Sequence, residues 1–265
     1  HLQTQGFVAM PKHYGNIIKA DREIYLVLQE WITSRQIALQ NSEDTPDLWS
    51  QEWIQLCLSS IDVAHKMLET LPAEKPGLLN AFEPWKALNL YGKLMDILIE
   101  ECAEAEQIDA LQLVKEAMLN FESDHAQLRW PRVPIHNDFN PRNTLIRSSG
   151  MPCIYDWELS MIDFPQRDVV EFLSFVLSED FDREELMAYL REHYHSIQQR
   201  KGPGHLLPFD DYLRATEMAV KTYICCRVSF YEVSGIVAKY DFSKRILAVS
   251  LRMLELLELA LETAH

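Results

Sequence analysis

Glycine is scarce in this chain, with 8 residues in 265, well under the usual share of about 7%. So few glycines argue against a fold built from many tight turns and favour helices. Basic residues are also in the minority, because Lys and Arg number 25 against 40 Asp and Glu, and the formal net charge is −15. A general nucleic-acid-binding protein needs a basic face that replaces phosphate counterions. We therefore expect no nucleic-acid partner.

Long apolar runs are missing as well. The longest, such as Ile24–Leu28, are far shorter than the roughly 20 residues that span a bilayer, and no signal-peptide pattern opens the chain. The five cysteines contain no C-x-x-C pair, so we expect core cysteines in a reducing compartment rather than disulfides or a zinc site. The sequence predicts a cytoplasmic protein without a membrane partner.

Apolar residues make up 48% of the chain, which is enough for a sizeable core, and their spacing predicts an α+β protein that is mostly α. Two strands are expected near the start, at 7–10 and 24–28, and a small β element near 144–156. Apolar spacings of three and four predict helices over 45–68, 88–103, 110–120, 167–177, 183–199, 210–240 and 243–263.

One segment carries a chemical signature. His136, Asp138 and Asn143 reproduce the H-x-D-x-x-x-x-N spacing of a kinase catalytic loop. Asp138 suits a carboxylate that orients an attacking hydroxyl and accepts its proton. Asn143 and Asp156 suit Mg²⁺, which prefers oxygen ligands.

A β-hairpin explains how the two proposed metal ligands come together. A turn at Ser149-Gly150 pairs residues whose numbers sum to 299, which places Asn143 opposite Asp156. Asp and Asn beside Pro are also common turn residues, so either half alone is explained by an ordinary turn. The two halves with a hairpin between them favour a functional site.

These segments resemble a known family. His136–Asn143 together with Asp156–Glu158 is similar to the aminoglycoside phosphotransferase and choline kinase superfamily, the small-molecule branch of the protein-kinase-like fold. Pro165–Val169 resembles the family's G-D-P-x-x-D-L stretch, with Asp168 as its structural Asp. Tyr25–Trp31 resembles the last strand of the N-terminal lobe and the hinge.

The resemblance implies a division of the chain and a set of roles. Residues 1–33 would be a remnant of the N-terminal lobe strands with the hinge, and 34–265 a helical C-terminal lobe with catalytic loop 136–143 and metal-binding segment 156–158. Asp138 would be the catalytic base and His136 would brace the loop, while Asn143 and Asp156 would hold Mg²⁺. The residues expected around ATP are Glu30, Trp31, Ile32, Leu145 and Tyr155.

The family's Gly-rich loop and its phosphate-binding Lys have no counterpart in this sequence. An N-terminal lobe missing from the chain, one supplied by another polypeptide, or a degenerate relative would each explain this. The retained Asp138, Asn143 and Asp156 favour the first explanation, because an inactive relative has no physical need to keep metal ligands. The resemblance then implies an ATP-dependent phosphotransferase that acts on a hydroxyl of a small molecule. The alternative is a kinase-like binding module without phosphotransfer, and a protein or fructosamine-type kinase is a second rival.

Other polar residues receive plainer interpretations. Acidic residues in the closing helices, Glu217 and Glu232, suggest a cationic acceptor as a hypothesis. His193 and His195 point to different faces of one helix, so we expect a solvated face rather than a shared metal. His65 is expected to pack at a helix end.

Overall fold

The computed structural model describes residues 2, 6–19, 24–33, 35, 37–201, 207–238 and 240–263, and it confirms a mostly helical α+β fold. The helices are α1 (Gln51–Leu68), α2 (Leu71–Glu74), α3 (Leu88–Glu101), α4 (Ala105–Ala117), α5 (Phe121–Gln127), α6 (Gln166–Val176), α7 (Arg183–Lys201), α8 (Phe209–Tyr223), α9 (Ser229–Ala238) and α10 (Ser243–Glu262). The strands are β1 (His13–Lys19), β2 (Ile24–Gln29), β3 (Ile37–Ala38), β4 (Val133–Ile135), β5 (Thr144–Arg147), β6 (Pro152–Ile154) and β7 (Met161–Asp163). No helix in the described ranges is long and apolar enough to cross a lipid bilayer.

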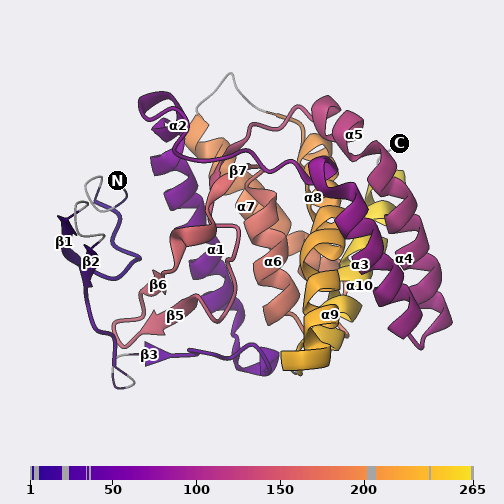
Figure 1. Cartoon of the computed structure of the whole chain (residues 1–265), viewed down its shortest axis with the longest axis horizontal. Helices are drawn as coiled ribbons and strands as arrows, with labels where there is room; N and C mark the ends of the chain where they lie inside the picture. Colours follow the sequence, from indigo (N-terminus) through magenta and orange to yellow (C-terminus); the bar gives the residue numbers. More distant parts are fainter. Residues whose placement is uncertain are drawn as a thin grey trace.

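Helix α6 lies at the centre of the helical body (Figure 1), where it packs against α8 and α10. All 11 of its residues are buried. Polar side chains on a fully buried helix must find partners inside the protein. Arg167, Asp168 and Glu171 each bond to the segment 136–143. Asp168 also bonds His65 on α1, and Arg167 also bonds Thr222 on α8.

Two short strands hold that segment in place. Strand β4 pairs antiparallel with β7, with Ile135 opposite Met161 and Val133 opposite Asp163. The catalytic segment begins directly after β4, and α6 begins shortly after β7. The pairing thus fixes the start of the catalytic segment beside the start of α6.

Strands β1 and β2 form an antiparallel sheet of their own at one end of the molecule (Figure 1). Two contacts near this sheet join it to the rest of the chain. The backbone N–H of Ile154 donates to the carbonyl of Ala9 at 2.9 Å, and Glu30 forms an ion pair with Arg147 at 2.8 Å. The division of the chain at residues 33 and 34 stays a prediction.

The structure corrects two predicted elements. Residues 7–10 form no strand, and Phe7 and Ala9 are buried against the core in an irregular segment. The helix predicted over 210–240 is divided, because a π-helical turn at Ile224–Val228 separates α8 from α9. Strands β3, β4 and β7 have two or three residues each, too few for a sequence pattern.

The predicted hairpin is present, and its predicted register is wrong by one residue. Strands β5 and β6 pair Leu145 with Cys153 and Thr144 with Ile154. The reason is a three-residue loop in which Gly150 adopts a φ of 80°, a left-handed conformation that favours glycine. Asn143 consequently lies opposite Tyr155, whose N–H donates to the Asn143 carbonyl at 3.0 Å, and Asp156 follows one residue later.

Candidate active site

Asp168 braces the start of the catalytic loop. Its carboxylate accepts the backbone N–H of His136 and that of Asn137, both at 2.8 Å, and it lies 2.8 Å from Nε2 of His65. Asn137 has a φ of 61°, a left-handed conformation that Asn tolerates better than most residues. The buried carboxylate thus holds a strained turn immediately before Asp138.

His136 lies inside the loop and does not reach solvent. Its Nε2 lies 2.8 Å from the carbonyl of Tyr155, and its Nδ1 accepts the backbone N–H of Asp138 at 3.3 Å. Burial lowers the pKa of His136, although Asp168, Asp138 and Asp156 act in the opposite direction. A neutral ring that donates through Nε2 satisfies both contacts, in agreement with a bracing role.

Two asparagine side chains hold the carboxylate of Asp138. Asn143 Nδ2 donates to Oδ2 at 2.6 Å, and Asn140 Nδ2 donates to Oδ1 at 3.0 Å. Asp138 and Asn143, both predicted site residues, are therefore in direct contact. The side chain of Asp138 is 19% exposed, so a small substrate can reach a carboxylate whose orientation is already set.

Glu171 of α6 lies behind this pair. Asn140 Nδ2 also donates to Glu171 Oε1 at 3.2 Å. Burial raises the pKa of Glu171 to about 7, and Arg227 opposes this while Asp138 adds to it. The loop thus contacts a buried acid that holds its proton far more readily than a solvated glutamate.

The sequence interpretation missed two arginines beside Asp138. Arg227, in the π-helical turn, donates to the Asn137 carbonyl and lies 3.6 Å from Asp138 Oδ1. Arg142 donates to Tyr231 Oη at 3.0 Å and lies 3.9 Å from the same carboxylate oxygen. π-helical turns often occur at functional sites, and an arginine inside the apolar run Ile224–Val228 was the signal that the sequence offered.

Asn143 and Asp156 offer oxygen atoms that suit Mg²⁺. Asn143 uses Nδ2 to bond Asp138, which leaves its Oδ1 for a cation. Asp156 is exposed, has a φ of 64°, and accepts no hydrogen bond from the described residues. An amide oxygen and an unpaired carboxylate on adjoining segments fit the donor preference of Mg²⁺.

The residues predicted around ATP lie in different environments. Glu30 is engaged with Arg147, at 2.8 and 2.9 Å, whereas Trp31 is 86% exposed and Leu145 only 1%. Tyr155 Oη donates to the Arg142 carbonyl at 2.5 Å, and Ile32 is half-buried just after the hinge. A nucleotide contact at Leu145 requires the residues over it to move, and the roles of all five stay predictions.

The acidic residues proposed for a cationic acceptor do not lie beside Asp138. Glu217 is paired with Lys221 at 2.5 Å, and Glu232 lines a hollow with Glu101 and Lys244. None of the three hollows that these glutamates line includes a residue of segment 136–143.

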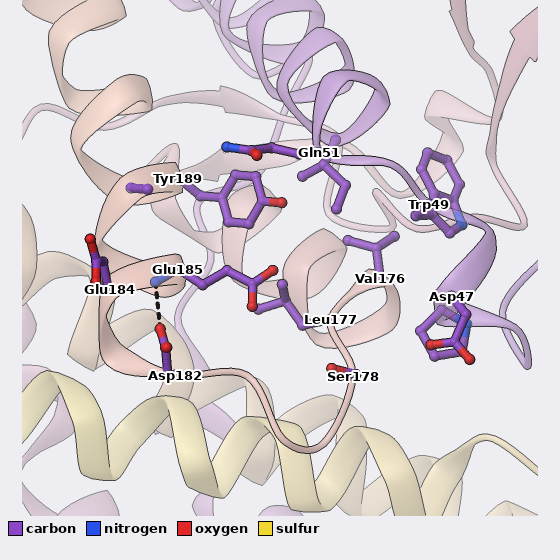
Figure 2. Close-up of a pocket in the computed structure, with 13 residues that line it drawn as sticks. Asp47, Trp49, Gln51, Val176, Leu177, Ser178, Asp182, Glu184, Glu185 and Tyr189 are labelled. Carbon is purple, nitrogen blue, oxygen red and sulfur yellow. Dashed lines mark hydrogen bonds between the residues drawn. The ribbon is translucent and has the colours of Figure 1, made fainter.

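A separate acidic hollow of about 480 Å³ lies between the starts of α1 and α7 and the end of α6. Figure 2 shows Glu185 and Tyr189 extending from α7 toward Leu177 and Gln51. The N–H of Glu185 donates to Asp182 Oδ1 at 2.8 Å, so the acidic side chain of Asp182 caps the first turn of α7. No residue of the catalytic loop lines this hollow.

His193 contradicts the expectation of a solvated face. Its side chain is buried, with 2% exposed, whereas His195 on the same helix is exposed. Helix α7 packs against α1, so the face that carries His193 turns inward toward His65. The sequence pattern missed this because α7 is rich in polar residues all round.

Comparison with known proteins assigns the family. A sequence model of the phosphotransferase enzyme family matches residues 1–202, which include the whole catalytic loop, the hairpin and Asp156. The chain belongs to the phosphotransferase enzyme family. Among curated proteins, no sequence matches this phosphotransferase-family chain significantly.

Solved structures of small-molecule kinases share its fold. Choline kinase from Cryptosporidium parvum is 12% identical with a TM-score of 0.59, and the match covers 99% of this chain and 77% of the kinase. An aminoglycoside phosphotransferase from Alicyclobacillus acidocaldarius is 13% identical with a TM-score of 0.57, covering 99% and 79%. Choline kinase LicA from Streptococcus pneumoniae is 17% identical with a TM-score of 0.52, covering 96% and 76%. The resemblance deduced from the catalytic loop is therefore confirmed for family and fold.

Proposed function

We propose that this phosphotransferase-family chain uses ATP and Mg²⁺ to phosphorylate a hydroxyl group of a small molecule. One observation carries the proposal. Both carboxylate oxygens of Asp138 accept hydrogen bonds from loop asparagines, Asn140 and Asn143, within the H-x-D-x-x-x-x-N spacing. Such a carboxylate is oriented in advance toward an incoming hydroxyl.

In the proposed reaction, the acceptor oxygen forms a bond to the γ-phosphorus while the bond from that phosphorus to the β–γ bridging oxygen breaks. ADP leaves, and the proton of the acceptor hydroxyl passes to the carboxylate of Asp138. A loose transition state demands little base strength, so positioning by the loop supplies much of the effect. Asn143 Oδ1 and the Asp156 carboxylate would hold Mg²⁺, which supplies neutralisation of phosphate charge when bound.

The acceptor that we propose to test first is a cationic amino alcohol or amino sugar. The structural relatives are described as choline, ethanolamine and aminoglycoside kinases, and these compounds combine a positive charge with a hydroxyl. The net charge of −15 would attract such cations over long range. The five free cysteines suit the reducing cytoplasm, where we propose that the protein works.

The test compares the wild type with Asp138→Asn. ADP production is measured with choline, ethanolamine and an aminoglycoside, and Mg-ATP binding is measured separately. We expect turnover to fall by about 10³-fold, within the range for loss of a general base, while nucleotide affinity changes less than about twofold. Asp109→Asn, an exposed substitution on α4, is the control.

Equal turnover in the wild type and Asp138→Asn would contradict the mechanism. Nucleotide binding by the wild type without ADP production on any acceptor would instead favour the kinase-like binding module.

A further inference from the structure

A cluster of three buried side chains lies apart from the atoms of the proposed reaction. Asp62 and His65 are on α1, three residues apart and thus on one helix face, and His193 reaches them from α7. Their potential ligand atoms all lie within 4.8 Å of one another. The exposed fractions of the three residues are 4%, 3% and 2%, so the cluster is shielded from water.

Two imidazole nitrogens in the cluster have no hydrogen-bond partner among the described residues: Nδ1 of His65 and Nε2 of His193. The opposite nitrogen of each ring is engaged, because His65 Nε2 bonds Asp168 at 2.8 Å and His193 Nδ1 bonds Tyr212 Oη at 2.8 Å. Buried polar atoms without partners are rare and indicate something that satisfies them.

We propose that Asp62, His65 and His193 form a binding site for a zinc-class divalent cation. Two imidazole nitrogens and one carboxylate oxygen are a common ligand set for zinc, with a fourth position open to water. Ligand atoms around a tetrahedral zinc ion lie about 3.4 Å apart, so small side-chain movements close the site.

The surroundings of the cluster support the assignment. A cavity of about 40 Å³ is lined by Asp62 and His65 and extends to Lys66 and Glu69, whose side chains are exposed. That volume is sufficient for a water molecule, which would serve as the fourth ligand of the proposed site.

The bonds of His65 connect the proposed site to the catalytic loop. Asp168 bonds His65 on one side and the backbone N–H groups of His136 and Asn137 on the other. A carboxylate that holds the second nitrogen of a metal-binding histidine is a recurring arrangement that fixes the ring. The cation therefore acts as a structural brace for the loop, and its binding does not depend on the proposed phosphotransfer.

The decisive experiment titrates the metal-free full chain with Co²⁺ and follows its visible absorption, then repeats the titration with Zn²⁺ in competition. We expect one equivalent to bind with the absorption of a four-coordinate site, and Zn²⁺ to displace it. His193→Gln should weaken binding by at least about 100-fold. The matched control is His195→Gln, which changes an exposed histidine two residues away and should leave binding unchanged.

A second variant, Asp62→Asn, tests the site independently in case His193→Gln fails to fold. Asp62→Asn preserves the shape of the side chain while it removes the charge, and near-ultraviolet circular dichroism verifies the packing of both variants. In the wild type, Zn²⁺ should slow amide hydrogen exchange at His136 and Asn137 by about tenfold, and it should not do so in His193→Gln.

Three results would overturn the proposal: no stoichiometric binding by the wild type, equal binding by folded His193→Gln, or binding lost in His195→Gln instead. The first would mean that an ordered water satisfies the two nitrogens.

Discussion

Buried carboxylates around the catalytic loop differ in protonation. Burial by itself would raise the pKa of Asp168, but the hydrogen bond and charge of His65, together with His136, lower it. Among the described residues, Asn140 alone donates a hydrogen bond to Glu171, and burial raises the pKa of Glu171 to about 7. Asp168 is therefore a charged carboxylate that holds the loop by hydrogen bonds, whereas Glu171 gains and loses its proton near neutral pH.

The raised pKa of Glu171 predicts a pH-dependent stability. The folded state keeps a proton on Glu171 up to about pH 7, whereas the unfolded state releases it near pH 4.5. This contribution is complete below pH 4.5 and is lost as the pH rises through 7. From pH 5 to pH 8, urea unfolding should show the wild type losing about 2 kcal/mol relative to Glu171→Gln.

The control for this experiment is Gln112→Ala, an exposed substitution on α4 that changes no titratable group, so its difference from the wild type should stay constant with pH. A constant difference for Glu171→Gln as well would show that Glu171 is ionised in the folded state.

Asp168→Asn should destabilise the protein by about 3–5 kcal/mol. The substitution places an amide NH₂ against two backbone N–H donors and His65, and the site is fully buried, so the donors lose their acceptor. Urea unfolding measures the change, and Asp109→Asn on exposed α4 serves as the control. A loss below about 1 kcal/mol would mean that the loop does not depend on this brace.

At the scale of elements, the short hairpin and the π-helical turn position the charged groups. The three-residue loop at Gly150 sets the β5–β6 register and thereby the neighbours of Asn143. The π-helical turn carries Arg227 to Asn137 and Asp138. The three-residue loop shifts the pairing of the hairpin by one residue, and the π-helical turn adds one residue to a helical turn. The neighbours of Asn143 and the position of Arg227 depend on these two shifts.

The ion pair between Glu30 and Arg147 connects the end of β2 to β5. The hydrogen bond from Arg147, followed by that from the backbone of Lys12, lowers the pKa of Glu30 to about 2. Glu30→Gln should cost at most about 1 kcal/mol, because both side chains are partly exposed. Amide exchange in β1 and β2 should accelerate about fivefold, while exchange in α6 stays unchanged.

The stabilising effect of this ion pair should be complete above pH 4.5 and fade as the pH falls toward 2. Glu69→Gln, which removes the exposed pair with Lys66 on α1, is the control. Unchanged exchange in β1 and β2 after Glu30→Gln would show that the ion pair does not anchor this sheet.

At the scale of the whole molecule, residues far apart in the sequence share one hydrogen-bond network. His65 on α1, Asp168 on α6 and the backbone of His136 are joined by contacts of 2.8 Å. Ligands that bind at either end of this network stabilise the folded chain against global unfolding, because they bind the folded state alone.

Mg-ATP at a hundredfold excess over its dissociation constant should stabilise the wild type by about 2.7 kcal/mol. Asp156→Asn should remove most of that gain, as should EDTA added to the wild type, since both eliminate the proposed metal contact. Thermal unfolding with and without Mg-ATP measures the effect. Asp109→Asn, on an exposed face of α4, should keep the full stabilisation, and equal stabilisation in Asp156→Asn would exclude Asp156 as a ligand.

Much of the candidate site could be predicted because its residues are close together in the sequence. Asp138, Asn143 and Asp156 lie within one short stretch, and a hairpin places its ends together whatever surrounds it. The spacing therefore predicted a hairpin between Asn143 and Asp156, and the hairpin is present with Asn143 opposite Tyr155, one residue before Asp156. The one-residue error in register came from the loop, because the same Ser-Ser-Gly sequence is compatible with a two- or a three-residue turn.

The sequence by itself determined the family, the mostly helical class and the hairpin that follows segment 136–143, since each depends on short-range spacing. Tertiary structure alone decided that Arg227 reaches Asp138, that Glu171 is buried against Asn140, and that His193 turns inward to His65. These contacts join residues separated by 31 to 128 positions. No local pattern encodes them, because they arise only when whole helices pack around α6.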